Sequence, residues 1–149
     1  MHIAKLDLKI CAVFIDSEPV EVDENGILVA SVAKLCSPPA QLASGRMRYH
    51  LLRKISICGK SADGLIEVEK GDAFSIIFLF DLIEFFEVSI LESKIIKVCE
   101  KSWNVKFMSS HPSKAFLDFC GRGNAVFFYD AKQGDLSLEI KFKRIKYFK

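Results

Sequence analysis

Hydrophobic and polar residues alternate over much of this chain, the pattern expected of strands that bury one face. Alternation over residues 6–10 runs into the apolar segment 12–15, which predicts one opening strand. In the stretch 19–32, the turn-forming residues 24–26 separate two β-prone arms. This second pattern predicts a hairpin.

Two prolines at 38 and 39 interrupt the pattern, and residues 40–43 are expected to form one short turn of helix. Alternation resumes over 46–58 and predicts one strand with a basic outer face. The polar segment 60–64 that follows, KSADG, has the composition of a turn.

The segment 65–80 predicts a second hairpin with its tip at 70–72 and a buried central strand over Phe74–Phe80. Residues 81–92 fit either a strand or a helix. Their β-branched and aromatic content favours the strand.

Helical spacing appears later in the chain. Apolar residues in 93–103 recur every three to four positions, which predicts an amphipathic helix with Ser93 as its cap. A second, short helix is expected over 111–121, opened near Pro112 and closed by Gly121.

The segments 124–130 and 135–148 predict a last hairpin, joined by 131–134 and bulged at 143–144. No repeat or long linker divides the chain. The expected fold is therefore α+β: a single domain over 1–149, with a mostly antiparallel β-sheet and two helices late in the chain.

Charge is unevenly distributed along the 149 residues, although the net charge is only +2. Residues 16–24 hold five acids and no base, residues 25–62 hold six bases and no acid, and 136–149 are mostly basic. Such segments can form opposed charged faces that favour association with a macromolecule. Thirteen phenylalanines predict a bulky core and an aromatic patch for a partner.

The apolar stretch 74–91 is nearly long enough to cross a membrane, but it contains Asp81, Glu84 and Glu87. Each acid near the centre of a bilayer costs up to about 2.5–3.5 kcal/mol, which excludes a spanning helix. The amino-terminal residues alternate and do not resemble a signal peptide. We therefore expect a cytoplasmic protein with five reduced cysteines and no membrane association.

Candidate chemical groups are few. Asp81, Glu84 and Glu87 have the spacing of an acid/base or metal set but lack a histidine nearby. Cys58 and Cys120 precede glycines and are the best-placed thiols, whereas Cys11, Cys99 and the glycines of 120–125 fit a core or a turn. We predict no catalytic residue, no metal site and no cofactor.

The leading hypothesis is a small protein-binding module, most concretely an immunity-type inhibitor that binds and occludes a bacterial toxin. One alternative is a nucleic-acid-binding domain that uses the basic and aromatic segments 46–54 and 141–149. Another is a small thiol-dependent enzyme. The expected partner-binding residues are Asp16, Glu18, Glu21, Asp23, Glu24, Arg46, Arg48, Arg53, Lys54, Glu84 and Glu87.

Overall fold

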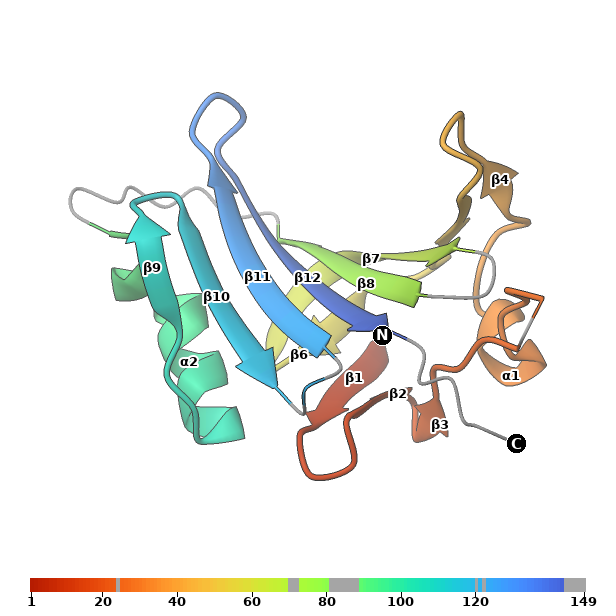
Figure 1. Cartoon of the computed structure of the whole chain (residues 1–149), viewed down its shortest axis with the longest axis horizontal. Coiled ribbons are helices and arrows are strands. Elements are labelled where there is room, and N and C mark those ends of the chain that lie inside the picture. The colour runs from red at the N-terminus through yellow and green to blue at the C-terminus, as the bar shows by residue number, and fades with distance from the viewer. Residues whose placement is uncertain (24, 70–72, 81–88, 120, 122, 144–149) are drawn as a thin grey trace.

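A computed structural model describes residues 1–23, 25–69, 73–80, 89–119, 121 and 123–143. In these residues the chain forms one strand-rich domain with two α-helices and a 3-10 turn (Figure 1). The expected α+β class with a mostly antiparallel sheet is confirmed. The elements are β1 (His2–Asp7), β2 (Ala12–Ile15), β3 (Glu18–Pro19), α1 (Ala30–Ala33), β4 (Ala40–Gln41), β5 (Met47–His50), β6 (Ile55–Ile57), β7 (Lys60–Glu69), β8 (Ala73–Phe80), η1 (Ile90–Glu92), α2 (Lys94–Trp103), β9 (Met108–His111), β10 (Lys114–Phe119), β11 (Gly123–Asp130) and β12 (Asp135–Lys143).

The described strands follow the order β3-β2-β1-β6-β7-β8-β12-β11-β10-β9, and β5 pairs with both β4 and β7. Their pairings are antiparallel except that of β1 with β6. The long strand β7 joins two groups of strands: its first residues pair with β6, and its later residues pair with β5.

Gly64 lies at the point of β7 where the pairing partner changes from β6 to β5. A Cβ atom at this position would lie 2.4 Å from Cδ1 of Leu51, in the segment between β5 and β6. The absence of a side chain therefore lets that connection pack directly against β7.

The core lies on one side of the sheet formed by β7, β8, β12, β11 and β10. Alternate residues of these strands are fully buried, among them Ile66, Phe78, Phe127 and Leu138. Helix α2 covers part of this side: Phe107, just after the helix, packs edge-to-face on Phe127 with ring centroids 5.1 Å apart. In Figure 1 strands β9–β12 and β8 stand in front, with α2 and β6 behind them.

Several elements confirm the sequence-based predictions. The buried strand over 74–80 is β8, the amphipathic helix is α2, and the last hairpin is β11–β12. Ser93 precedes α2 as expected, but its hydroxyl makes no capping hydrogen bond. That hydroxyl is buried and has no hydrogen-bond partner among the residues that the structure describes.

The amino-terminal predictions need correction. The opening segment is a hairpin of β1 and β2, since the chain turns back between Asp7 and Ala12. In the segment 19–32, a single bridge between Val22 and Leu28 replaces two regular arms, and residues 30–33 are the helix α1.

The middle of the chain also differs from expectation. Residues 40–41 form strand β4, not a helical turn. The stretch 46–58 is two strands, β5 and β6, that pair with different parts of β7. Residues 60–64, predicted as a turn, are part of β7. The chain reverses just before them, at Cys58-Gly59, where both residues have positive φ.

The prediction of a second late helix over 111–121 is wrong. Residues 114–119 form β10, which pairs with β11 over its whole length. Ala115, Leu117 and Phe119 face the core, and the residues between them face away.

Of the segment 81–92, for which a strand was favoured, residues 81–88 lie outside the described part of the chain, and the described end, Ile90–Glu92, is the 3-10 turn η1 and not a strand. The hairpin tip at 70–72 and the bulge at 143–144 also involve residues outside the described part, apart from Lys143. Among the described helices, none is long and apolar enough to span a membrane.

Candidate functional site

The side of the sheet opposite the core carries a group of large apolar side chains that water reaches. We call this surface the open face. Strand alternation and the pairing registers place its residues side by side on β7, β8, β12, β11, β10 and β9. Its central residues are Leu65, Ile77, Leu79, Met108, Phe116, Val126, Phe128, Ser137 and Glu139.

Exposure distinguishes the open face from an ordinary wet strand surface. Met108 is 65% exposed, Phe128 is 40% exposed, and Phe116 and Leu79 are each 37% exposed. Met108 pairs with Phe116 across β9 and β10, which makes a continuous apolar contact at this end of the sheet. Exposed apolar groups of this kind often mark interaction sites.

Strand β12 divides the apolar residues into two clusters. Glu139 of β12 stands between Val126 of β11 and Ile77 of β8, and Ser137 stands between Phe128 and Leu79. A partner that covered both clusters would therefore also meet a carboxylate and a hydroxyl at the centre. These polar groups can fix the orientation of a bound surface.

A basic residue accompanies the aromatic cluster. The ammonium group of Lys114 lies 5.8 Å from the centroid of the Phe128 ring, within the range of a cation–π contact. Lys114 is exposed and pairs with Phe128 across β10 and β11. The aromatic end of the open face thus combines apolar area with positive charge.

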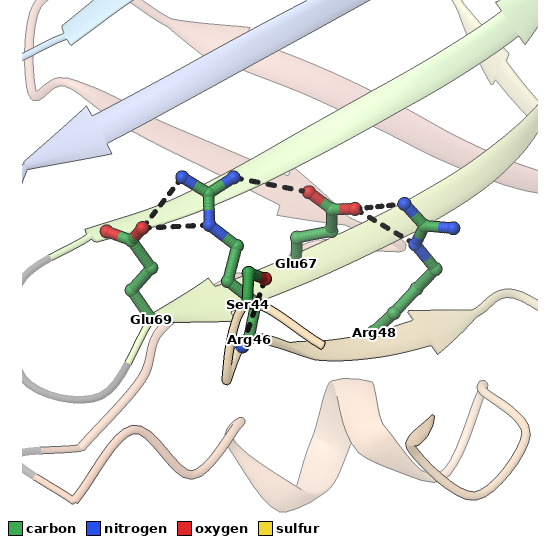
Figure 2. A network of polar contacts seen from close by, with 5 residues as sticks. All are labelled: Ser44, Arg46, Arg48, Glu67 and Glu69. Carbon is green, nitrogen blue, oxygen red and sulfur yellow. Dashed lines mark hydrogen bonds and ion pairs between the residues drawn. The ribbon is translucent and has the colours of Figure 1, made fainter. Parts of the chain in front are cut away.

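At the opposite end of the sheet, two arginines of the β5 region bind two glutamates of β7 (Figure 2). Arg48 donates to Oε1 of Glu67 from Nε at 2.9 Å and also from Nη2. Arg46 donates to Oε1 of Glu69 at 2.8 Å from Nε and 2.7 Å from Nη2, and its Nη1 lies 3.7 Å from Oε2 of Glu67. The Glu67 side chain is only 8% exposed, so both arginines compensate its buried charge.

This Arg–Glu network changes the interpretation of the basic segment 46–54. Arg46 and Arg48 are not a free positive surface, because two carboxylates neutralise their charge. Lys54 also lies beside an acid, with Nζ 3.1 Å from Oδ1 of Asp63, while Arg53 is exposed. In the second basic segment, 141–149, residues 144–149 lie outside the described part.

The acidic residues of segment 16–24 also fall into two groups, those that bind the chain itself and those that are exposed. Asp16 accepts the N–H of Ile3 at 2.8 Å and contacts the His2 ring, so it fixes the turn after β2. These hydrogen bonds, the backbone one first, hold the pKa of Asp16 below its ordinary value.

Asp23 also has a local role, since its Oδ1 accepts the N–H groups of Asn25 and Ile27. Glu18 and Glu21 are exposed. Among the described interactions, neither side chain makes a contact that a partner would have to displace. Glu24, Glu84 and Glu87 lie outside the described residues, as do Asp81 and Cys120. The described residues contain no group of three potential metal ligands.

The cysteines differ from the expectation of five reduced thiols. Cys11 is disulfide-bonded, so the expectation that it is reduced is wrong, although it is partly buried and packs against the core. Cys36, Cys58 and Cys99 are free, and Cys99 is buried as expected. Structural disulfides are uncommon in a reducing cytosol, and the cytoplasmic location stays a prediction.

A surface depression of about 320 Å³ lies at the end of α2, lined by Lys97, Glu100, Lys101, Asn104, Val105 and Lys106. Glu100 is already engaged, because its Oε2 accepts the N–H of Phe107 at 2.8 Å. An anion here would face the negative end of the helix dipole. The depression is therefore a poorer candidate than the open face.

Sequence reasoning missed the open face in part because one of its six strands, β10, was predicted to be a helix. Alternation in 114–119 and 123–130 was the available signal: it places Phe116, Val126 and Phe128 on the side away from the core. The Arg–Glu network had a signal too, since both pairs of residues are spaced two apart on β-prone segments.

Comparison of the chain with protein-family models finds no match. Curated proteins and solved structures give no match either.

Proposed function

We propose that the protein is a protein-binding module that acts by covering a surface of its partner with the open face. The observation that carries this proposal is the exposure of Leu79, Met108, Phe116 and Phe128 on one side of a paired sheet. Strand pairing holds the backbone of these residues in place, so little backbone entropy is lost when a partner covers them. Exposed aromatic residues are common anchors of protein interfaces.

The apolar area is of the right order for the centre of an interface. Covering the exposed parts of these four side chains removes on the order of 300 Å² from water, worth about 7 kcal/mol at 25 cal/mol per Å². A stable interface buries about 800 Å² on each partner, so polar neighbours must contribute the remainder. Glu139, Ser137 and Lys114 are suitable neighbours on the same face.

The Arg–Glu network argues against nucleic acid as the partner. Phosphate binding requires cations that are available to replace counterions, whereas Arg46 and Arg48 are already paired with Glu67 and Glu69. A gel shift at low salt with single- and double-stranded nucleic acid tests this point. We expect no binding, and a strongly salt-dependent shift would favour the nucleic-acid alternative.

A narrower form of the proposal is an immunity-type inhibitor that occludes a bacterial toxin. Its support is the open face together with the exposed acids Glu18 and Glu21, which are suited to a basic partner. Asp16 and Asp23 contribute less, because both bind the backbone of their own turns.

The test uses the product of the neighbouring reading frame as the probe, since an inhibitor and its toxin are expected to be encoded together. We expect this product to bind the wild-type chain and its toxicity to be suppressed. The double variant Phe116→Ser/Phe128→Ser should weaken binding by about 100-fold or more, the loss of roughly two anchor residues.

The matched control is Leu52→Ser, because Leu52 is 68% exposed but lies between β5 and β6, away from the open face. This control should bind like the wild type. Equal binding by the double variant, with its fold intact by circular dichroism, would contradict the use of the open face. Failure of the neighbouring product to bind would contradict the narrower form.

A further inference from the structure

The residues of the open face are arranged about one line that crosses the sheet. The pairing registers place Ala115, Phe127, Leu138 and Phe78 side by side on strands β10, β11, β12 and β8. All four side chains are fully buried on the core side. We call this row of residues the centre line. Strand alternation therefore places on the open face the residues one position before and one position after each of them.

The apolar residues on the two sides of the centre line match each other. On β11 they are Val126 and Phe128, and on β8 they are Ile77 and Leu79. A two-fold axis that runs along the centre line, above the open face, would place a second copy over it with antiparallel strands. Phe128 would then cover Val126 of the second copy, and Leu79 would cover its Ile77.

The charges at the two ends of β12 are opposite in sign. Asp135 and Lys141 lie three positions before and after Leu138, so both belong to the open face. They are about 20 Å apart along one strand, which is too far for an ion pair within one chain. In the two-fold arrangement, Asp135 lies opposite Lys141 of the second copy, and the symmetry forms this pair twice. The surface is thus complementary in charge to itself.

The polar residues at the centre also find partners. Ser137 and Glu139 flank Leu138, so the Ser137 hydroxyl of one copy faces the Glu139 carboxylate of the other and can donate to it. On β10, Lys114 and Phe116 flank the centre line. The arrangement brings the Lys114 ammonium group to the Phe116 ring of the second copy, a cation–π contact.

The open face has close to the area that a dimer interface requires. The strands β7, β8, β12, β11, β10 and β9 lie side by side at about 4.8 Å, and three outward residues along each span about 20 Å, a flat area on the order of 600 Å². Accessible surface follows the side chains and exceeds the flat area. Each copy therefore contributes close to the roughly 800 Å² of a standard interface.

We propose that the open face binds the open face of a second copy of this chain in an antiparallel, two-fold symmetric dimer. The inference rests on the proposed function, because it names the partner of the same surface when no other protein covers it. Burial of Glu139 costs free energy that a single hydroxyl recovers only in part. We expect a dissociation constant of roughly 1–100 µM, weak enough for another partner to replace the second copy.

Sedimentation equilibrium of the full-length chain, at concentrations that bracket this range, measures the association. We expect a reversible monomer–dimer equilibrium. Asp135→Lys and Lys141→Asp each replace two ion pairs by two like-charge contacts, and each should weaken the dimer by at least about 10-fold. An equal mixture of the two variants, one of them fluorescently labelled, should form a heterodimer of nearly wild-type affinity, because both pairs are again of opposite charge.

The matched control is Lys5→Glu, a charge reversal at an exposed residue of β1, away from the open face. This control should dimerise like the wild type. A wild-type chain that stays monomeric throughout would overturn the proposal. So would a dimer that neither reversal on β12 weakens, or a mixture of the two reversals that forms no heterodimer.

The wild-type chain also provides a test that needs no variant. A carbodiimide joins a carboxylate to an amine in direct contact, with loss of one water. We expect peptide mapping of the cross-linked dimer to find Asp135 joined to Lys141, a link that one chain cannot form across about 20 Å. A cross-linked dimer without this link would overturn the proposal even if a variant fails to fold.

Failure of this inference is distinguishable from failure of the proposed function. A monomeric wild-type chain whose binding to the neighbouring product still depends on Phe116 and Phe128 would exclude the second copy and leave the proposed function standing. A dimer with the expected charge dependence would support the second copy. If the neighbouring product then bound the Phe116→Ser/Phe128→Ser variant as it binds the wild type, the face would serve self-association alone.

Discussion

The two sides of the β7–β8–β12–β11–β10 sheet are made by the same strands yet have different compositions. On the core side, Ile66, Phe78, Phe127 and Leu138 are fully buried. On the open face, two polar residues of β12 separate two partly exposed apolar clusters. Burial alone explains the apolar composition of the core side. The open face, in contrast, keeps apolar side chains that folding alone does not require.

The largest expected difference is between the neighbouring residues Phe127 and Phe128. Phe127 is fully buried and Phe128 is 40% exposed. Phe127→Ala should lower the free energy of unfolding by about 3–5 kcal/mol because it leaves a cavity. Phe128→Ala should cost at most about 1.5 kcal/mol. Urea denaturation measures both, and equal losses would show that the open face belongs to the core.

The Arg–Glu network allows a second test of burial, now for charge. Glu67→Gln should destabilise by about 1–3 kcal/mol, because Arg48 would lose the carboxylate that it binds in a half-buried site. Glu69→Gln is the matched control: its side chain is 42% exposed, so we expect a loss below about 1 kcal/mol. Thermal unfolding of the two variants compares them directly. A larger loss for Glu69→Gln would invert the assigned roles.

A smaller effect is expected at the aromatic end of the open face. Lys114→Met keeps most of the side-chain stem but removes the charge above Phe128, and should cost about 0.5 kcal/mol. A double-mutant cycle with Phe128→Leu isolates this contact. A coupling energy of zero would mean that Lys114 is simply solvated beside the ring.

The smallest expected effect is a pH-dependent change in stability at Asp16, a residue away from both sides of the sheet. Because the pKa of Asp16 is lowered in the folded chain, its contribution to stability is present above the ordinary value of 3.8 and is lost as the pH falls through the folded value. Asp16→Asn should therefore reduce stability at neutral pH and leave it nearly unchanged at a pH below the folded pKa of Asp16. Urea titrations at pH 7 and pH 3 compare the variants, and an equal loss at both would contradict the assigned hydrogen bonds.

The hydrophobic pattern of a segment predicted its structure correctly where the neighbouring elements favour the same conformation. The apolar run 74–80, the helical spacing of α2 and the alternation of β12 each specify one structure without further information. The segment 111–121 misled because Pro112 and Gly121 resemble helix ends, whereas pairing with β11 made it a strand. Likewise KSADG has turn composition, but partners on both sides extend it into β7.

The sequence by itself determined the class of fold, the main core strands and the amphipathic helix, because these follow from residue periodicity. Only the tertiary structure decided what the charges do. Arg46 meets Glu69 across 23 positions of sequence, and Arg48 meets Glu67 across 19. Such contacts depend on strand order and register, which local sequence does not specify. The open face likewise emerged only when β9–β12 were aligned and their outward residues became neighbours.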